Sequence, residues 1–329
     1  ALAALPLLTL LLPGLLLAQD QKTAFLTADE AGPDFEVQGE YSASLGEADV
    51  KVGIQVIAQG SGTFRAVGYI GGLPGDGWDG QPETRIAGSG KMDGEVCILK
   101  SDHPDHQGRA VIREGMLILY DGDNVKVGEL RKVNRESPTL GKAPPRGAVV
   151  LFDGTTADHF AGGRLSADKL LMEGVTSKQK FGSYSLHLEF MLSFMPWARG
   201  QGRANSGCYQ QGRYEVQILD SFGLEGKNNE CGGVYEIADP AIKMCFPPMA
   251  WQTYDIYYHA AQFDESGKKQ KNAWLTVRHN GVVVHDRLKL PRGTRAAPVK
   301  EGPEDGPIYL QNHGNPIRFR NIWLLPITD

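Results

Sequence analysis

The sequence has no excess of positive charge, few cysteines and no long amphipathic helical pattern. Its 34 Lys and Arg against 39 Asp and Glu give a formal net charge of −5, which offers no broad attraction for nucleic acid or anionic lipid. None of its 4 cysteines forms a C-x-x-C pair, which argues against a structural zinc site. With no helical period, the 41 Gly and 19 Pro predict many short strands joined by turns.

Residues 1–18 are rich in Leu, carry no charge and end in the small residue Ala18. This composition is typical of the apolar core and cleavage region of an export signal whose basic beginning is missing. The alternative is a membrane anchor, but a run of about 18 residues interrupted by Pro and Gly is at the lower limit for a span. We therefore expect an exported protein, periplasmic or extracellular, with no stable membrane span once the signal is removed.

The remaining chain divides at residues 135–146, "RESPTLGKAPPR", which lack apolar periodicity and are predicted to be a linker. Residues 24–134 before it show repeated strand and turn signals, which predict a small β-rich domain of unknown role. Residues 147–329 alternate apolar and polar side chains without crossover helices. This pattern predicts an all-β fold here, an antiparallel jelly-roll β-sandwich.

Cys231 and Cys245 flank a stretch rich in Gly and Pro. An exported protein can form disulfides, and a bridge closing this loop would stabilise the fold by about 3 kcal/mol in the chain-entropy description. Two free, buried thiols are the equal alternative. The sequence does not decide between them.

The strand predicted around "RYEVQIL" raises a functional question. Its alternation turns Tyr214, Val216 and Ile218 to one side and Glu215 and Gln217 to the other. The first set forms a core face. The second faces either ordinary solvent or the floor of a binding cleft.

Several long motifs answer that question by resemblance. In chain order they are "LFDGTTADHF", "ARGQGRANSGCYQQGRYEVQILDSFG", "NNECGGVY", "FPPMAWQTYDI", "VRHNGVVVHD" and "GPIYLQNHGNPIRFRNIWLLPI". Through them, residues 147–329 resemble the 3-keto-disaccharide hydrolase family, formerly a domain of unknown function. The resemblance implies a concanavalin-like jelly roll with a sugar-binding concave face, and cleavage of glycosides already oxidised at C3. It does not cover the N-terminal domain.

The implied chemistry needs a few defined groups. A ketone at C3 acidifies the C2 proton, so a base can remove it, the C1 substituent is eliminated, and water then adds to the unsaturated sugar. A donor or cation must stabilise the C3 oxygen. On the matching motifs, the candidate catalytic residues are Glu215, Glu230 and His313. The candidate carbohydrate-binding residues are Asn205, Tyr209, Gln211, Gln217, Asp220, Gln311, Arg318 and Arg320.

Other assignments stay open at this point. Carboxylates and His in one cleft could hold a divalent metal that polarises the ketone, but no H-x-x-x-H or EF-hand pattern supports one, and the metal is undecided. His103 and His106 are interpreted as a solvated loop because no third ligand is evident nearby. His187 and Glu189 share another polar strand face, which is expected to be solvated, and they rank below Glu215.

Two further functions are carried as alternatives to the 3-keto-glycoside enzyme. One is a carbohydrate-binding module without catalysis, because fold does not fix function. The other is a conventional glycosidase with two carboxyl groups flanking C1. The sequence does not determine the aglycone, the linkage, the anomer or the oligomeric state.

Overall fold

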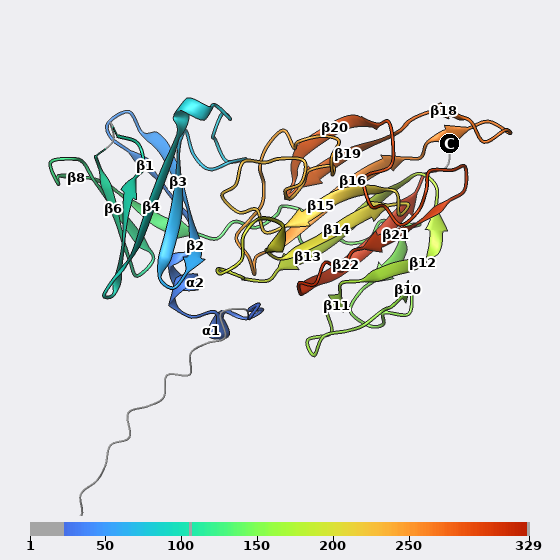
Figure 1. Ribbon diagram of the computed structural model, residues 1–329, viewed down its shortest axis with the longest axis horizontal. Coiled ribbons are helices and arrows are strands. Elements are labelled where there is room, and N and C mark those ends of the chain that lie inside the picture. Colours follow the sequence, from blue (N-terminus) through green and yellow to red (C-terminus); the bar gives the residue numbers. More distant parts are fainter. Residues whose placement is uncertain (1–22, 105–106, 328–329) are drawn as a thin grey trace, which may run out of the picture.

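The computed structural model describes residues 23–104 and 107–327, which form a β-barrel followed by a β-sandwich (Figure 1). The predicted export signal at residues 1–18 and His106 lie outside the described residues. Within the described ranges, no helix has the length and apolar character needed to cross a bilayer.

The barrel is made of consecutive antiparallel strands that close when the first pairs with the last. The strands are β1 (Gly39–Leu45), β2 (Val50–Gly60), β3 (Thr63–Ile70), β4 (Arg85–Asp93), β5 (Val96–Ser101), β6 (Arg109–Arg113), β7 (Met116–Tyr120) and β8 (Lys126–Val133). A short 3-10 helix, η1 (Pro82–Thr84), precedes β4. Two short helices, α1 (Ala28–Ala31) and α2 (Pro33–Val37), lie at the end of the barrel that carries the β2–β3 turn, where Asp34 accepts from the amide of Gly62.

The sandwich consists of two antiparallel sheets. The first has the strand order β10 (Phe160–Ala161), β12 (Val175–Phe181), β21 (Gly306–Leu310), β14 (Asn205–Gln210) and β15 (Tyr214–Leu219). The second has the order β11 (Leu171–Met172), β22 (Ile317–Pro326), β13 (Tyr184–Leu192), β16 (Trp251–His259), β19 (Ala273–His279) and β20 (Val282–Leu290), with β9 (Val149–Phe152) also paired to β22. A small hairpin of β17 (Gln262–Phe263) and β18 (Lys269–Lys271) and a 3-10 turn, η2 (Gly200–Gly202), complete the fold.

Apolar side chains from both sheets meet between them and form the core of the sandwich. Leu188 and Phe190 of β13 and Val216 and Ile218 of β15 are all fully buried. Because successive strand residues point to opposite faces, each strand sends every second residue into this core. The structure confirms the predicted all-β class, an antiparallel jelly-roll sandwich preceded by a small β-rich domain.

The barrel and the sandwich share apolar packing. Ile57, Val67 and Tyr69 lie on the outer face of the barrel, yet they belong to the same hydrophobic cluster as the sandwich core. Arg85 of the barrel pairs with Glu225 of the sandwich at 2.6 Å. Ile57, Val67 and Tyr69 are therefore apolar, although they point out of the barrel, because a second layer covers them.

All four cysteines, which are Cys97, Cys208, Cys231 and Cys245, are free and buried. The structure therefore shows Cys231 and Cys245 as two free thiols buried in the sandwich core, one of the two alternatives that the sequence left open.

Candidate active site

Glu215 lies in β15, at the edge of the five-stranded sheet, and points away from the sandwich core as its alternation predicts. Its side chain is nevertheless buried, with 3% of the residue exposed. The backbone of Glu215 accepts a hydrogen bond from the amide of Tyr235, and its own amide donates to Thr294 Oγ1. The segments that contain Tyr235 and Thr294 thus cover the free edge of β15 beside this buried carboxyl group.

A chain of hydrogen bonds fixes the Glu215 carboxylate. Tyr209 is the cross-strand partner of Glu215, and its hydroxyl donates to Glu215 Oε2 at 2.7 Å. The side-chain amide of Gln311 donates in turn to the Tyr209 hydroxyl at 3.2 Å. Tyr309 of β21 packs its ring against Tyr209, with 5.2 Å between the ring centroids. Three adjacent strands therefore hold one carboxyl group in a defined position.

Burial raises the pKa of Glu215 to about 7, and the hydrogen bond from Tyr209 partly opposes this rise. A carboxyl group with a pKa near neutrality can both remove a proton and return it at physiological pH, which is the property that general acid–base catalysis requires. Burial also raises the pKa of Tyr209, so this phenol stays protonated as a donor.

Gly207 makes room for the second carboxylate oxygen. Glu215 Oε1 lies so close over Gly207 that a Cβ atom there would overlap it. Within the described part of the chain, no hydrogen bond to Oε1 occurs. Of the two oxygens, Oε1 is therefore the one available to a reacting group, while Oε2 is held by Tyr209.

A row of amide side chains continues from this carboxyl group along the same face. Gln217 contacts Gln201 of η2 with 3.4 Å between Nε2 and Oε1, and Asn205 donates to the carbonyl of Gln201 at 2.8 Å. The Oδ1 atom of Asn205 is buried and has no hydrogen-bond partner among the described residues. A buried acceptor of this kind is unfavourable unless a bound group or water donates to it, so Asn205 has a free acceptor position for such a donor.

His313 lies in the loop between β21 and β22 and is exposed. Both ends of the loop are hydrogen-bonded to β14. The backbone amide of Gln311 donates to Gly207 O at 2.9 Å, and the backbone amide of Asn205 donates to Asn315 Oδ1 at 3.1 Å. The loop is thus attached to the strand that carries Tyr209. The catalytic role of His313 stays a prediction.

Glu230 lies in the loop that follows β15, but its carboxylate closes its own turn. It accepts from the amides of Gly226 at 2.6 Å and Lys227 at 3.2 Å. Among the described residues, no hydrogen bond joins Glu230 to Glu215. Its placement therefore favours Glu215 over Glu230 as the base.

The other four candidate binding residues have internal partners away from Glu215. Asp220 is buried and pairs with Arg203 at 2.6 Å. Gln211 is buried in the turn between β14 and β15 and binds Phe181 O and the hydroxyl of Tyr258.

Arg318 and Arg320 lie on β22, in the other sheet, where they pair with Glu173 at 3.3 Å and Glu189 at 2.7 Å. The structure does not bring these two arginines to the face of Glu215. They share a sequence motif with Gln311, but the chain changes sheets between β21 and β22.

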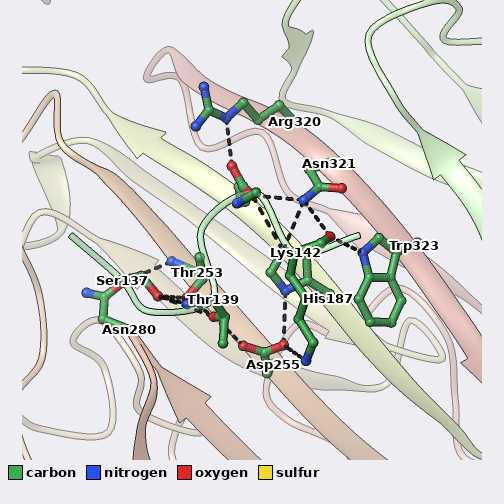
Figure 2. Close-up of polar contacts among 12 residues, drawn as sticks. Ser137, Thr139, Lys142, His187, Thr253, Asp255, Asn280, Arg320, Asn321 and Trp323 are labelled. Carbon is green, nitrogen blue, oxygen red and sulfur yellow. Dashed lines mark hydrogen bonds and ion pairs between the residues drawn. The ribbon is translucent and has the colours of Figure 1, made fainter. Parts of the chain in front are cut away.

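A second polar cluster lies on the outer face of the seven-stranded sheet (Figure 2). His187 Nδ1 is 3.0 Å from Asp255 Oδ1, and its Nε2 is 3.6 Å from Glu189 Oε1. The sequence predicted His187 and Glu189 on a solvated face, and this is wrong, because 0% and 1% of their side chains are exposed. The predicted linker covers them, with the amide of Gly141 donating to Glu189 at 2.6 Å and Lys142 pairing with Asp255 at 2.9 Å.

The carboxylates of this second cluster differ from Glu215 in their electrostatics. Burial opposes the ionisation of Asp255, but hydrogen bonds from His187, Thr139 and Lys142 outweigh it and lower its pKa to about 2. Burial likewise opposes ionisation of Glu189, while His187, Asn321 and Arg320 lower its pKa to about 2. Both groups stay ionised and paired, so this cluster fixes the linker to the sheet, whereas the raised pKa of Glu215 lies close to neutrality.

Three residues near Glu215 and its hydrogen-bonding neighbours were not predicted from the sequence. They are Gly207, Gln201 and Tyr309. Gly207 has the same alternation parity as Tyr209 and Asn205, and this signal could have identified it. Gln201 lies in a 3-10 turn, which strand periodicity does not reach. In the described ranges there is no group of three or more His, Cys, Asp and Glu side chains arranged to hold a metal ion.

Comparisons with known proteins concern the sandwich. A family model described as a 3-keto-alpha-glucoside-1,2-lyase-like domain matches residues 147–325. A crystal structure of a "putative glycosyl hydrolase" from Parabacteroides distasonis ATCC 8503 is 30% identical, with a TM-score of 0.49, over 56% of this chain and 85% of its own. A second structure of the same description and organism is 16% identical, with a TM-score of 0.42, over 60% of this chain and 99% of its own. Among curated proteins, none matches the chain.

Proposed function

The chain belongs, through residues 147–325, to the family of 3-keto-α-glucoside 1,2-lyase-like domains, and we propose that it is an enzyme that cleaves glycosides already oxidised to a ketone at C3. The observation that carries this proposal is the Glu215 carboxyl group. It lies on a sheet face beside amide side chains, and burial raises its pKa to about 7. An acidified C–H bond next to a ketone needs a base of this strength, whereas an unactivated sugar C–H bond would not yield to it.

In the proposed reaction, Glu215 Oε1 takes the proton from C2 and the C2–H electron pair forms an enolate with the C3 carbonyl. The enolate then re-forms the ketone, a C1–C2 double bond appears, and the C1–O bond breaks to release the aglycone, which takes up a proton. Water adds across the double bond, with its oxygen at C1 and a proton returning to C2. The net change is hydrolysis, and protonated Glu215 can supply the returning proton.

The neighbouring residues have distinct roles in this scheme. Tyr209 is a positioning residue, because it holds Oε2 and leaves Oε1 free. Asn205 Oδ1 is an acceptor for a sugar hydroxyl, and the amides of Gln217 and Gln311 are donors and acceptors on the same face. The exposed His313 is the candidate acid for the leaving aglycone.

The test compares 3-keto-trehalose or a 3-keto-glucoside with the unoxidised parent sugar. We expect release of 3-keto-glucose from the oxidised substrate and no cleavage of the parent. Equal cleavage of both sugars would indicate a conventional glycosidase with two carboxyl groups. Saturable binding of the oxidised sugar without turnover would instead indicate a carbohydrate-binding module.

We also propose that the protein is exported, on the composition of residues 1–18. Mass spectrometry of the protein from its native host tests this, and we expect a chain that lacks the Leu-rich segment. A mature chain that retains Leu10–Leu17 would contradict export with cleavage.

A further inference from the structure

The barrel contains an apolar cavity that the proposed reaction does not use. Its volume is about 440 Å³, and inward-facing residues of β2 to β7 line it, among them Ile54, Ala66, Ile86, Leu99, Ala110 and Leu119. An eight-stranded barrel is just wide enough either to be filled by its own side chains or to hold one small ligand. The volume lies within the range of about 300–1,000 Å³ that is usual for sites of small molecules.

The cavity exists because the two ends of the barrel are packed differently. Towards the end covered by α1 and α2, the large side chains of Tyr41, Phe64 and Leu117 are buried in the barrel core. Towards the other end, inward positions carry Ala66, Gly68 and Ala110 and leave space between the strands. A small protein gains stability from a filled core, so an apolar space of this size is unusual unless something occupies it.

The open end of the barrel also carries exposed apolar side chains. Val50, Ile70, Val125 and Val127 are 41%, 44%, 59% and 51% exposed, and they are four of the six large hydrophobic residues that are exposed in the described part of the chain. They lie where β2 and β8 begin and where β3 ends, and Ile70 and Val127 line the cavity itself. The apolar surface thus continues from the cavity to the mouth.

Of the charged residues that line the cavity, Lys100 is exposed to water, and Arg109 and Asp121 are engaged by neighbouring groups. Arg109 lies over the ring of Tyr120 at 4.2 Å and donates to Asn124 Oδ1 at 2.6 Å. Asp121 Oδ1 accepts from the amides of Asp123 and Val125 in its own turn. A charged ligand group would lose its hydration inside the cavity without finding a partner.

We propose that the barrel binds one small, uncharged, predominantly apolar molecule in this cavity, with entry between Val50, Ile70 and Val127. The proposal does not depend on the reaction proposed for the sandwich. The volume and apolar lining of the cavity, with Ile70 and Val127 leading to it from the exposed surface, favour a small external molecule as the occupant.

The test uses the full chain and the uncharged fluorescent probe N-phenyl-1-naphthylamine. We expect saturable binding of one probe per chain with a rise in fluorescence. The double substitution Ala66→Leu and Ala110→Leu fills the cavity and should raise the Kd of the probe by roughly tenfold or more, where tenfold corresponds to ~1.4 kcal/mol. Ala48→Leu adds the same side chain at an exposed turn position outside the cavity lining and should leave binding unchanged.

A second variant covers the case in which the double substitution overpacks the barrel and prevents folding. Ile70→Asp changes an exposed residue of the mouth, so the fold should tolerate it, but the ligand must then pass a charge and binding should weaken. Unchanged probe affinity in a folded cavity-filled variant or in Ile70→Asp would overturn the proposal. So would the absence of probe binding together with a dimer that Ile70→Asp dissociates, because the mouth would then be an interface between two copies.

Discussion

Tyr209 and Glu215 face each other across β14 and β15, with the phenol donating to the carboxylate at 2.7 Å. The two groups are unequal partners, because burial raises both pKa values but only that of Glu215, at about 7, falls near neutrality. The pair therefore behaves as one titrating carboxyl group with a fixed donor. The following predictions depend on this relationship and on its contrast with the ionised cluster around His187.

Glu215→Gln removes the base while keeping the shape of the side chain and most of its hydrogen bonds. We expect turnover of a 3-keto-glycoside to fall by about 10²–10⁴-fold, the usual contribution of general-base catalysis, with little change in affinity. The matched control is Glu265→Gln, an exposed carboxyl group near the β17–β18 hairpin, which should leave turnover unchanged. Unchanged turnover in Glu215→Gln would remove this residue from the mechanism.

Tyr209→Phe should shift the pH dependence of kcat/KM. The phenol hydrogen bond lowers the pKa of Glu215, so its loss should raise this pKa above its present value of about 7. Because the base acts when ionised, the rising limb of the pH profile moves to higher pH. Tyr309→Phe removes a hydroxyl from the neighbouring ring, which makes no hydrogen bond to Glu215 in the described structure, and should leave the profile in place. A Tyr209→Phe profile that coincides with wild type would contradict the positioning role.

Glu215 should also make the wild-type protein less stable at high pH. Its folded pKa of about 7 lies above the ordinary value of 4.5, so the folded state holds a proton that the unfolded state has released. Stability therefore falls as pH rises from about 4.5 to about 7, and the full loss is on the order of 3 kcal/mol. Glu215→Gln lacks this loss. Its free energy of unfolding in urea, relative to that of wild type, should therefore be higher at pH 8 than at pH 5. A pH-independent difference would contradict the raised pKa.

Asp255→Asn should release the linker from the seven-stranded sheet. The folded pKa of Asp255 is about 2 against an ordinary 3.8, so its ionised form contributes stability that is lost as pH falls through this range. We expect the free energy of unfolding to fall by about 1–3 kcal/mol at pH 7, because His187, Thr139 and Lys142 lose a charged partner. Trypsin should then cleave faster at Lys142 and Arg146, while the exposed Asp286→Asn should behave as wild type. Equal cleavage rates would show that the linker does not depend on this cluster.

Gly207→Ala should separate activity from folding. The added Cβ would overlap Glu215 Oε1 and would lie 2.9 Å from the ring of Tyr209, so both side chains of the pair must shift. Because no backbone atom is among these contacts, the strand can remain. We expect a folded protein with turnover reduced by roughly tenfold or more, since a misplaced catalytic group commonly has an effect of this size or larger. Gly202→Ala is the control, because a Cβ there meets no atom within 4 Å. Full activity in Gly207→Ala would show that the position of Oε1 is not critical.

Periodicity predicted the faces of the strands but not which strands are neighbours. The alternation in "RYEVQIL" correctly turned Glu215 away from Val216 and the core. The alternation did not indicate that the side chain of Gln311 would contact Tyr209. Nor did it indicate that Arg318, seven positions later in the chain, would pair with Glu173 in the other sheet. That separation arises in the loop between β21 and β22, and a loop carries no periodic signal.

The sequence also could not reveal the contacts of the predicted linker. Thr139 and Lys142 occur in a segment rich in Pro and Gly, which locally is typical of an exposed connection. Their partner Asp255 is more than a hundred residues away in the chain, at a separation of 113 residues from Lys142. Burial of His187 and Glu189 follows from this distant contact and not from their own strand, so the solvated face was the natural expectation from local pattern alone.

The pairing of β9 with β22 sets the order in which the chain can fold during its synthesis. β9 begins at Val149, shortly after the linker, but the strand it pairs with, β22, comes from residues 317–326. The ribosome must therefore release nearly two hundred further residues before β22 can enter the sheet between β11 and β13. Until then, β9 and the apolar side of the barrel around Ile57 lack their final neighbours, and such long-range pairing slows folding and exposes apolar surface. Completion of this sheet in the growing chain depends on β22, and protection of the nascent protein matters most over this interval.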